Sequence, residues 1–140
     1  MIILKLKRAT FKYIESELYS YKDTLKEIDR LRDEILYGNS DEDENVGGGR
    51  SSIPGKPTEQ IATRLLTHKT LRNLEEVANA ITDVYDMVTD DHRKVIELKY
   101  FKNPHLTWDD VAYQLNMHRN TAFKLRREVV QLIANKLGLR

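Results

Sequence analysis

Apolar residues recur every three or four positions between residues 10 and 37, which is the spacing of one face of an α-helix. The steps of three and four alternate as in the heptad repeat of a coiled coil. Arg32 occupies one position of the repeat, with Leu31 beside it. We therefore expect a single long helix over residues 10–37, with Thr10 as its N-cap. Its apolar face comprises Phe11, Ile14, Leu18, Tyr21, Leu25, Ile28 and Ile35.

A second amphipathic pattern covers residues 58–88, and Val77 and Val84 widen its apolar face. A face this wide needs more than one neighbour. It favours packing of the two long helices within one chain together with a contact to a second copy. His68 lies on this face and is expected to be packed there rather than to bind a ligand. The face comprises Ile61, Leu65, His68, Leu71, Leu74, Ala78, Ile81, Tyr85 and Val88.

The segment 38–57 separates these two patterns. It combines the acidic run Asp41–Glu44 with the glycine run Gly47–Gly49 and contains few apolar residues. Such a composition buries too little apolar surface to offset the entropy of ordering the chain, so we expect a flexible linker. The glycines and the following Arg50 could bind a phosphate through backbone N–H groups. No strand precedes them and no Gly-Lys-Ser/Thr ending follows, which favours the linker.

Shorter elements follow residue 88, and local end signals mark them. Thr89 or Asp90 can cap a helix that ends before Asn103-Pro104. Thr107 and Asp110 have the spacing of a capping box. Asn116 tolerates the left-handed backbone conformation of a turn, and Gly138 can close the final helix. These signals predict helices over 89–100, 108–115 and 118–137.

The last two helices have the dimensions of a helix-turn-helix. Apolar residues form its inner face, among them Ala112 where the helices cross and Met117 in the turn. The other inner residues are Val111, Leu115, Ala122, Leu125, Val129 and Leu132 or Ile133. Residues of the final helix are left on the outer surface: Arg119, Asn120, Thr121, Phe123, Lys124, Arg126 and Arg127.

This outer surface has the chemistry of a DNA-reading helix. Arg119 can offer two donors to guanine, and Asn120 can pair with adenine in the major groove. Lys124, Arg126 and Arg127 suit phosphates, which position a protein on DNA without reading its sequence. Thr107 and Trp108 begin the first helix of the pair and complete the expected DNA-binding set. Trp108 is expected at the edge of the core, with its indole N–H able to contact a phosphate.

Charge is distributed unevenly along the chain, although the net charge is only +1. Residues 92–140 contain ten Lys and Arg against four Asp and Glu, whereas residues 58–91 contain three against seven. A concentrated basic end predicts a polyanionic partner. The acidic segment is a candidate surface for contact with RNA polymerase.

Several classes of function are disfavoured. Without cysteine there is no disulfide, thiol nucleophile or Cys-ligated zinc site. No apolar run is long enough to span a membrane and no secretory signal follows Met1, so we expect a protein of the bacterial cytoplasm. Asp109 and Asp110 have a capping explanation, and His92, His105 and His118 fall in separate elements. We therefore expect no enzyme, cofactor or metal.

Residues 89–137 resemble the fourth-region DNA-binding unit of sigma factors, through RKVIELKYF and LTWDDVAYQLNMHRNTAFKLRREVV. The likeness extends over nearly the whole chain through RATFKYIESELYSYKDTLKEIDRLRDEIL and GGGRSS. Over this length the chain resembles the RinA-type phage transcriptional activators. The resemblance implies a phage or prophage regulator that activates late transcription. Two positions depart from the pattern: His118 stands where serine usually caps the recognition helix, and Ala122 where a larger apolar residue is usual.

Taken together, the sequence predicts an all-α, sequence-specific DNA-binding transcriptional activator that forms a homodimer through its long helices. Two alternatives remain, a phage DNA-packaging accessory of the small-terminase type and a sigma-like module that binds polymerase. The expected parts are an N-terminal interaction helix over 1–37, a linker over 38–57, a packing helix over 58–88 and a DNA-binding domain over 89–140.

Overall fold

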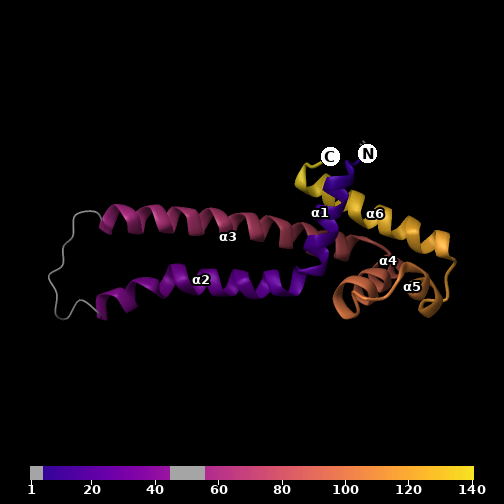
Figure 1. Ribbon diagram of the computed structural model, residues 1–140, viewed down its shortest axis with the longest axis horizontal. Coiled ribbons are helices and arrows are strands. Elements are labelled where there is room, and N and C mark those ends of the chain that lie inside the picture. The colour runs from indigo at the N-terminus through magenta and orange to yellow at the C-terminus, as the bar shows by residue number, and fades with distance from the viewer. Residues whose placement is uncertain (1–4, 45–55) are drawn as a thin grey trace. The chain divides into compact units, whose positions relative to one another are not determined.

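The computed structural model describes residues 5–44 and 56–140, and within these ranges every regular element is helical (Figure 1). The predicted all-α fold class is confirmed. The elements are α1 (Arg8–Tyr19), α2 (Tyr21–Glu44), α3 (Lys56–Met87), α4 (Asp90–Val95), the π-helix η2 (Ile96–Lys102), α5 (Trp108–Gln114) and α6 (Arg119–Leu137).

The chain divides into two compact units. The first unit comprises Met1–Lys22 together with Glu76–Arg140, and the second comprises Asp23–Glu75. The N-terminal helix α1 therefore groups with the C-terminal elements rather than with the rest of the segment 1–37. Helix α3 contributes its beginning to the second unit and its end to the first.

The single helix expected over residues 10–37 is two helices. Helix α1 ends at Tyr19 and α2 begins at Tyr21. The intervening Ser20 donates its backbone N–H to the Ser16 carbonyl oxygen at 3.1 Å. Apolar spacing did not reveal this break because it continues with the same period on both sides.

The ends of this region also differ from expectation. Helix α1 follows Lys7, and Thr10 is not its cap. The Thr10 hydroxyl instead donates to the Arg140 carbonyl oxygen at 2.6 Å. Helix α2 continues to Glu44, so the acidic run expected in a linker is helical. Gly47–Gly49 and Arg50 lie outside the described residues.

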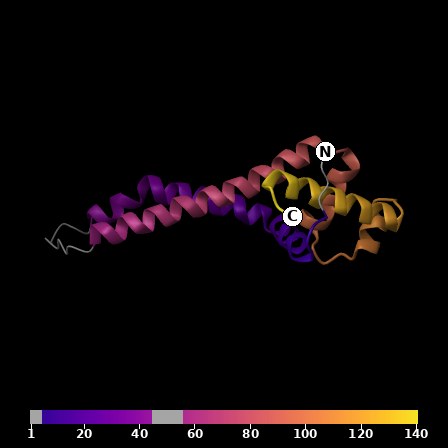
Figure 2. The same cartoon turned by 90° about the horizontal axis from the view of Figure 1, so that it is seen from above.

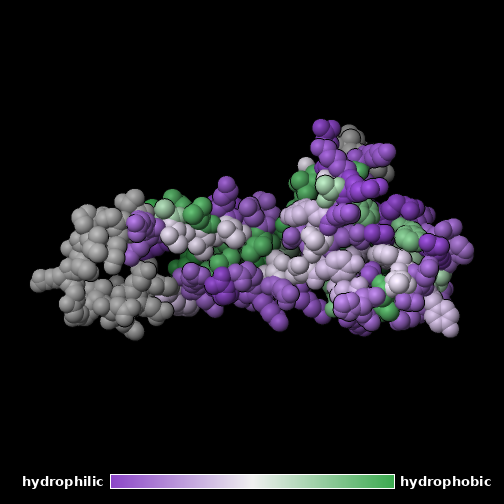
Figure 3. Space-filling model, in the orientation of Figure 1, coloured by the Kyte–Doolittle hydropathy of each residue, from purple (hydrophilic) through white to green (hydrophobic). Residues whose placement is uncertain are grey.

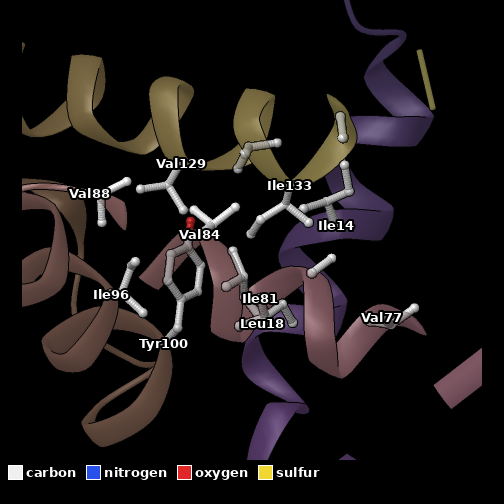
Figure 4. Close-up of a cluster of buried hydrophobic side chains, with 13 residues drawn as sticks. Ile14, Leu18, Val77, Ile81, Val84, Val88, Ile96, Tyr100, Val129 and Ile133 are labelled. Carbon is white, nitrogen blue, oxygen red and sulfur yellow. The ribbon is translucent and has the colours of Figure 1, made fainter. Parts of the chain in front are cut away.

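Four elements build the core of the first unit, which Figure 4 shows in close-up. Ile14 and Leu18 of α1 are fully buried, which makes α1 part of the core of the first unit. Tyr100 of η2 lies among the aliphatic side chains with 2% of its surface exposed. The other contributors include Ile81 and Val84 from α3, Ile96 from η2, and Val129 and Ile133 from α6.

The π-helix η2 replaces the last turns of the helix expected over residues 89–100. The expected cap is present, since the Thr89 hydroxyl accepts from the His92 backbone N–H at 3.4 Å. Beyond Val95 the turns widen, and Asn103 N–H donates to the Leu98 carbonyl oxygen five residues earlier at 2.9 Å. Hydrogen bonds of this spacing define a π-helix.

In the second unit α2 and the beginning of α3 run side by side in opposite directions, as both views show (Figures 1 and 2). Ile28 and Leu31 of α2 and Leu71 of α3 are buried. Arg32 Nη2 lies 2.7 Å from Glu75 Oε2. The two long helices thus pack within one chain over this stretch, as the width of the apolar face predicted.

Four residues of the predicted apolar faces are exposed. Leu25 is 40% exposed, and the neighbouring Thr24 is buried in its place. The buried face of α2 is therefore rotated by one residue there, where the sequence pattern gave the wrong position. His68 is exposed rather than packed, as are Ile61 and Leu65 before it. The described residues therefore leave the first half of the α3 apolar face exposed.

Candidate nucleic-acid interface

Helix α5 and the turn after it are held by local backbone chemistry. The Thr107 hydroxyl accepts from Asp110 N–H at 3.1 Å, and an Asp110 carboxylate oxygen accepts from Thr107 N–H at 3.3 Å. This is the predicted capping box. Asn116 adopts a positive φ of 54°, and Met117 N–H donates to the Ala112 carbonyl oxygen at 2.9 Å. The turn between α5 and α6 is therefore tight and defined.

Helix α6 is capped at both ends. His118 acts as the N-cap, since its Nδ1 accepts from the Asn120 backbone N–H at 3.1 Å. The imidazole thus performs the role that a serine hydroxyl usually performs. Gly138 has a φ of 70° and ends the helix in the left-handed conformation, as predicted.

The inner face of the α5–α6 pair is the predicted one. Val111, Ala112, Ala122 and Val129 are each at most 4% exposed, and Leu125 is 8% exposed. The small Ala122 is completely buried, although a larger side chain is usual in the family that the sequence resembles. Because this face fixes the rotation of α6, it determines which residues of the helix remain outside.

Five of the seven expected outer residues of α6 are exposed, namely Arg119, Asn120, Thr121, Lys124 and Arg127. Arg119 Nε lies 3.0 Å from Asp109 Oδ1, with both side chains about two-thirds exposed at 64% and 65%. Its guanidinium also lies 5.3 Å from the centre of the Phe123 ring. Exposed ion pairs contribute little free energy, so Arg119 can leave Asp109 for another partner. Among the described residues Lys124 and Arg127 have no ion pair.

Arg126 is not an outer residue, contrary to expectation. Its Nε and Nη2 donate to the two carboxylate oxygens of Glu15 at 2.9 and 2.7 Å. Tyr100 Oη donates to the same carboxylate at 2.6 Å. The guanidinium lies 5.1 Å from the Phe11 ring centre and 5.0 Å from the Trp108 ring centre. Arg126 therefore joins α1, η2, α5 and α6 instead of facing a phosphate.

Two titratable groups of this cluster, the Arg126 guanidinium and the Tyr100 phenol, have raised pKa values. Burial opposes the charge on Arg126, but the hydrogen bonds and negative charge of Glu15 outweigh it and raise the pKa of the guanidinium. Burial, followed by the charge of Glu15, raises the pKa of the Tyr100 phenol far above its ordinary value. The guanidinium thus stays charged and the phenol stays protonated at neutral pH, so both remain hydrogen-bond donors to Glu15.

The two aromatic residues of the expected DNA-binding set lie at the edge of the core. Trp108 is half-buried, with its ring centre 6.0 Å from that of Tyr100 and 6.2 Å from that of Phe123. This confirms Trp108 as a core-edge residue. Phe123 is also half-buried and is covered by the guanidinium of Arg119. Thr107 is exposed, but its hydroxyl is already used in the cap.

Two residues outside the predicted set, Glu15 and Lys99, hold α6 and the segment before α5 in place. Glu15 accepts hydrogen bonds from Arg126. In the sequence, only its position next to Ile14 on the inner face of α1 indicates that Glu15 is buried. Lys99 is buried, and its Nζ donates to the carbonyl oxygens of Pro104 and Leu106 at 2.8 and 2.6 Å. Burial lowers the pKa of Lys99. These bonds fix the segment that leads into α5.

Two further features were not found in the part of the chain that the structure describes. No group of three or more His, Asp or Glu side chains there is arranged to hold a metal ion. None of the helices described is long and apolar enough to cross a membrane.

Comparison with known proteins places the chain in a family. Residues 12–135 match the family described as protein of unknown function DUF722. The chain belongs to this family. The chain is also 26% identical over 133 residues to the transcriptional activator rinA of Staphylococcus phage phi11, and this alignment covers 95% of the chain and 94% of the phage protein. The resemblance to RinA-type activators is thereby confirmed. No solved structure matches the chain.

Proposed function

We propose that the protein is a sequence-specific DNA-binding activator of phage or prophage late genes, with α6 as its recognition helix. One observation carries the proposal: Arg119, Asn120, Lys124 and Arg127 form an exposed polar surface on the first half of a helix capped at both ends. The similarity to a phage transcriptional activator supports the same role. An α-helix fits the major groove of B-DNA, and its first turns reach the base edges.

Base recognition in this proposal belongs to Arg119 and Asn120. When α6 enters the groove, Arg119 leaves the exposed Asp109 carboxylate and offers its two donors to guanine O6 and N7. Asn120 pairs with adenine N6 and N7. The Phe123 ring beneath the Arg119 guanidinium restricts its motion and so favours one orientation.

Phosphate contacts belong to Lys124 and Arg127, which are exposed and have no ion pair in the described residues. Arg126 positions the helix through Glu15 and does not bind DNA in this proposal. Activation requires that bound protein recruits polymerase, and the acidic segment 58–91 is the proposed contact surface.

Two alanine variants test whether Arg119 recognises bases while Lys124 contacts phosphates. Arg119→Ala should weaken binding to the specific site by about 1–3 kcal/mol, or roughly 5- to 150-fold, with little effect on unrelated DNA. Lys124→Ala should weaken binding to both duplexes by similar factors. The specific site is first mapped by footprinting on the DNA that encodes the protein, and both affinities are then measured at one salt concentration.

Lys26→Ala provides the matched control, because Lys26 is an exposed lysine of the second unit. It should bind both duplexes like the wild type. Equal losses on specific and unrelated DNA for Arg119→Ala would contradict a base-reading role. Failure of the wild type to bind any duplex, together with binding to polymerase, would support the sigma-like alternative instead.

We also propose that two copies associate through the second unit. Its apolar side chains Leu36, Ile61, Leu65 and Leu66 are between 56% and 69% exposed, and Figure 3 shows apolar surface along the α2–α3 pair. Ile61 and Leu65 continue the apolar spacing of α3 into the first half of the helix, where the described residues leave this face exposed. A second copy would bury this surface and present two recognition helices to a two-fold-related DNA site.

Sedimentation equilibrium over a range of concentrations tests the association. The wild type should be a dimer, and Leu65→Lys should shift the protein toward monomer at the same concentration. Tyr113→Ser is the control, since Tyr113 is 84% exposed but lies on α5 in the first unit. It should remain dimeric. A wild-type monomer would contradict the proposal, and a ring of many subunits would favour the packaging alternative.

A further inference from the structure

The start of α1 carries a cluster of positive charge that the proposed recognition helix does not explain. Lys5, Lys7, Arg8 and Lys12 are all exposed, and no acidic residue occurs from residue 5 to residue 14. None of the four has an ion pair within the described part of the chain. We call these four residues the N-terminal cation cluster. Figure 3 shows hydrophilic side chains gathered at this end of α1.

The cluster is unfavourable for the protein on its own. Four like charges within eight residues repel one another. The positive end of the helix dipole adds to this repulsion, because the first turn of α1 contains no acidic residue. A bound polyanion would relieve both effects.

The contacts of α1 fix the place of this cluster on α6. The Thr10 hydroxyl, within the span of the cluster, donates to the Arg140 carbonyl oxygen just beyond the C-terminal end of α6. Phe11 directly precedes Lys12, and its ring lies 5.1 Å from the Arg126 guanidinium. That guanidinium lies in turn 5.0 Å from Trp108, the first residue of α5. Arg8 is three residues before Phe11 and therefore lies on the same side of α1. All of these residues belong to the first unit, so the cluster has a defined place relative to α6.

The spacing along α6 matches the dimensions of a DNA groove. Arg119 and Arg126 are seven residues apart, which corresponds to roughly 10 Å at 1.5 Å per residue. The major groove is about 12 Å wide, and phosphates line its edges. If Arg119 reaches a base in the groove, the part of α1 that packs on Arg126 lies near its phosphate edge.

We propose that the N-terminal cation cluster binds backbone phosphates of the duplex whose bases α6 reads. This inference rests on the proposed DNA binding and adds a second contact surface from the opposite end of the chain. The cluster raises affinity for any duplex and carries no sequence preference, because phosphates are the same at every base pair. Each cation that neutralises a phosphate releases counterions and so steepens the salt dependence of binding.

The salt dependence of binding tests this role directly. In Arg8→Gln/Lys12→Gln the slope of log K against log salt should decrease in magnitude by about 1.8, which is 0.9 for each lost phosphate contact. Between 50 and 200 mM salt the wild type should therefore lose about 12-fold more affinity than the variant. The mapped site and an unrelated duplex should show the same change, so the preference between them stays constant.

Lys22→Gln/Lys26→Gln is the matched control, with the same charge change and the same spacing of four residues. Lys22 and Lys26 are exposed but lie beyond the other end of α1. The control should keep the wild-type slope. Circular dichroism and the urea midpoint check that both double variants remain folded.

Three outcomes would overturn the inference: an unchanged slope in Arg8→Gln/Lys12→Gln, an equal decrease in the control, or a changed preference between the two duplexes. If the slope is unchanged but Arg119→Ala loses affinity only for the mapped site, the cation cluster does not bind phosphates, and the proposed base recognition by α6 still holds. If the slope decreases as expected in Arg8→Gln/Lys12→Gln but Arg119→Ala shows no selective loss, Arg119 does not read bases. The two proposals therefore fail in distinguishable ways.

Discussion

Glu15→Ala is expected to lower the free energy of unfolding of the first unit by about 2–4 kcal/mol, less than for a fully buried ion pair because the Arg126 side chain is 26% exposed. Glu15 is 8% exposed and accepts three hydrogen bonds, two from Arg126 and one from Tyr100. Alanine leaves a guanidinium and a phenol without their acceptor in a poorly solvated site. Urea unfolding of the full chain, followed by circular dichroism, measures the change.

A double variant distinguishes the net contribution of the ion pair to the free energy of unfolding from the cost of leaving the Arg126 charge without a partner. Glu15→Leu/Arg126→Met replaces both partners with apolar side chains and should recover most of the lost stability. Asp33→Ala is the control, because Asp33 is an exposed acid of α2. Its unfolding midpoint should match that of the wild type. A loss below 1 kcal/mol in Glu15→Ala would show that the contact does not hold α1 in place.

Leu18→Ala is expected to cost about 2–5 kcal/mol, whereas Leu25→Ala should cost less than about 1 kcal/mol. The two residues are seven positions apart on the apolar pattern that predicted one continuous helix. Leu18 is fully buried in α1, but Leu25 of α2 is 40% exposed. Alanine at residue 18 therefore leaves a cavity among packed side chains, while alanine at residue 25 removes a side chain that is partly in water.

Thermal or urea unfolding of the two variants decides between the broken helix and a continuous heptad face. Since both substitutions are Leu→Ala in helices, helix propensity affects them equally. Equal losses would contradict the different burial of the two leucines and would favour the uninterrupted heptad face.

Sequence patterns that involve only neighbouring residues correctly predicted the local structure of α5, α6 and the turn between them. The Thr107–Asp110 capping box, the positive φ of Asn116 and the Gly138 end of α6 are all present. A cap depends on a side chain and a backbone group within three residues of each other, and both are visible in the sequence. The inner face of α6 was also predicted, because helical periodicity is a local property.

Features that depend on distant partners could not be predicted in this way. Arg126 has the sequence context of an exposed phosphate ligand, and only its contact with Glu15, 111 residues earlier, turns it inward. The break at Ser20 has the same origin, because the partners of the chain change there while the apolar spacing does not. The buried Lys99 shows a third case, since the carbonyl groups that bind it belong to a loop without a characteristic motif.

The pairing of α1 with α6 also has a consequence for how the protein is made. Helix α1 leaves the ribosome well before α6, with Ile14, Leu18 and Glu15 exposed to water. Their partners on α6 emerge only after more than one hundred further residues have been synthesised. The nascent chain therefore cannot complete the first unit until α6 has been synthesised, and closure of this long loop is expected to govern its folding rate. Until then α1 has to stay free of other apolar partners.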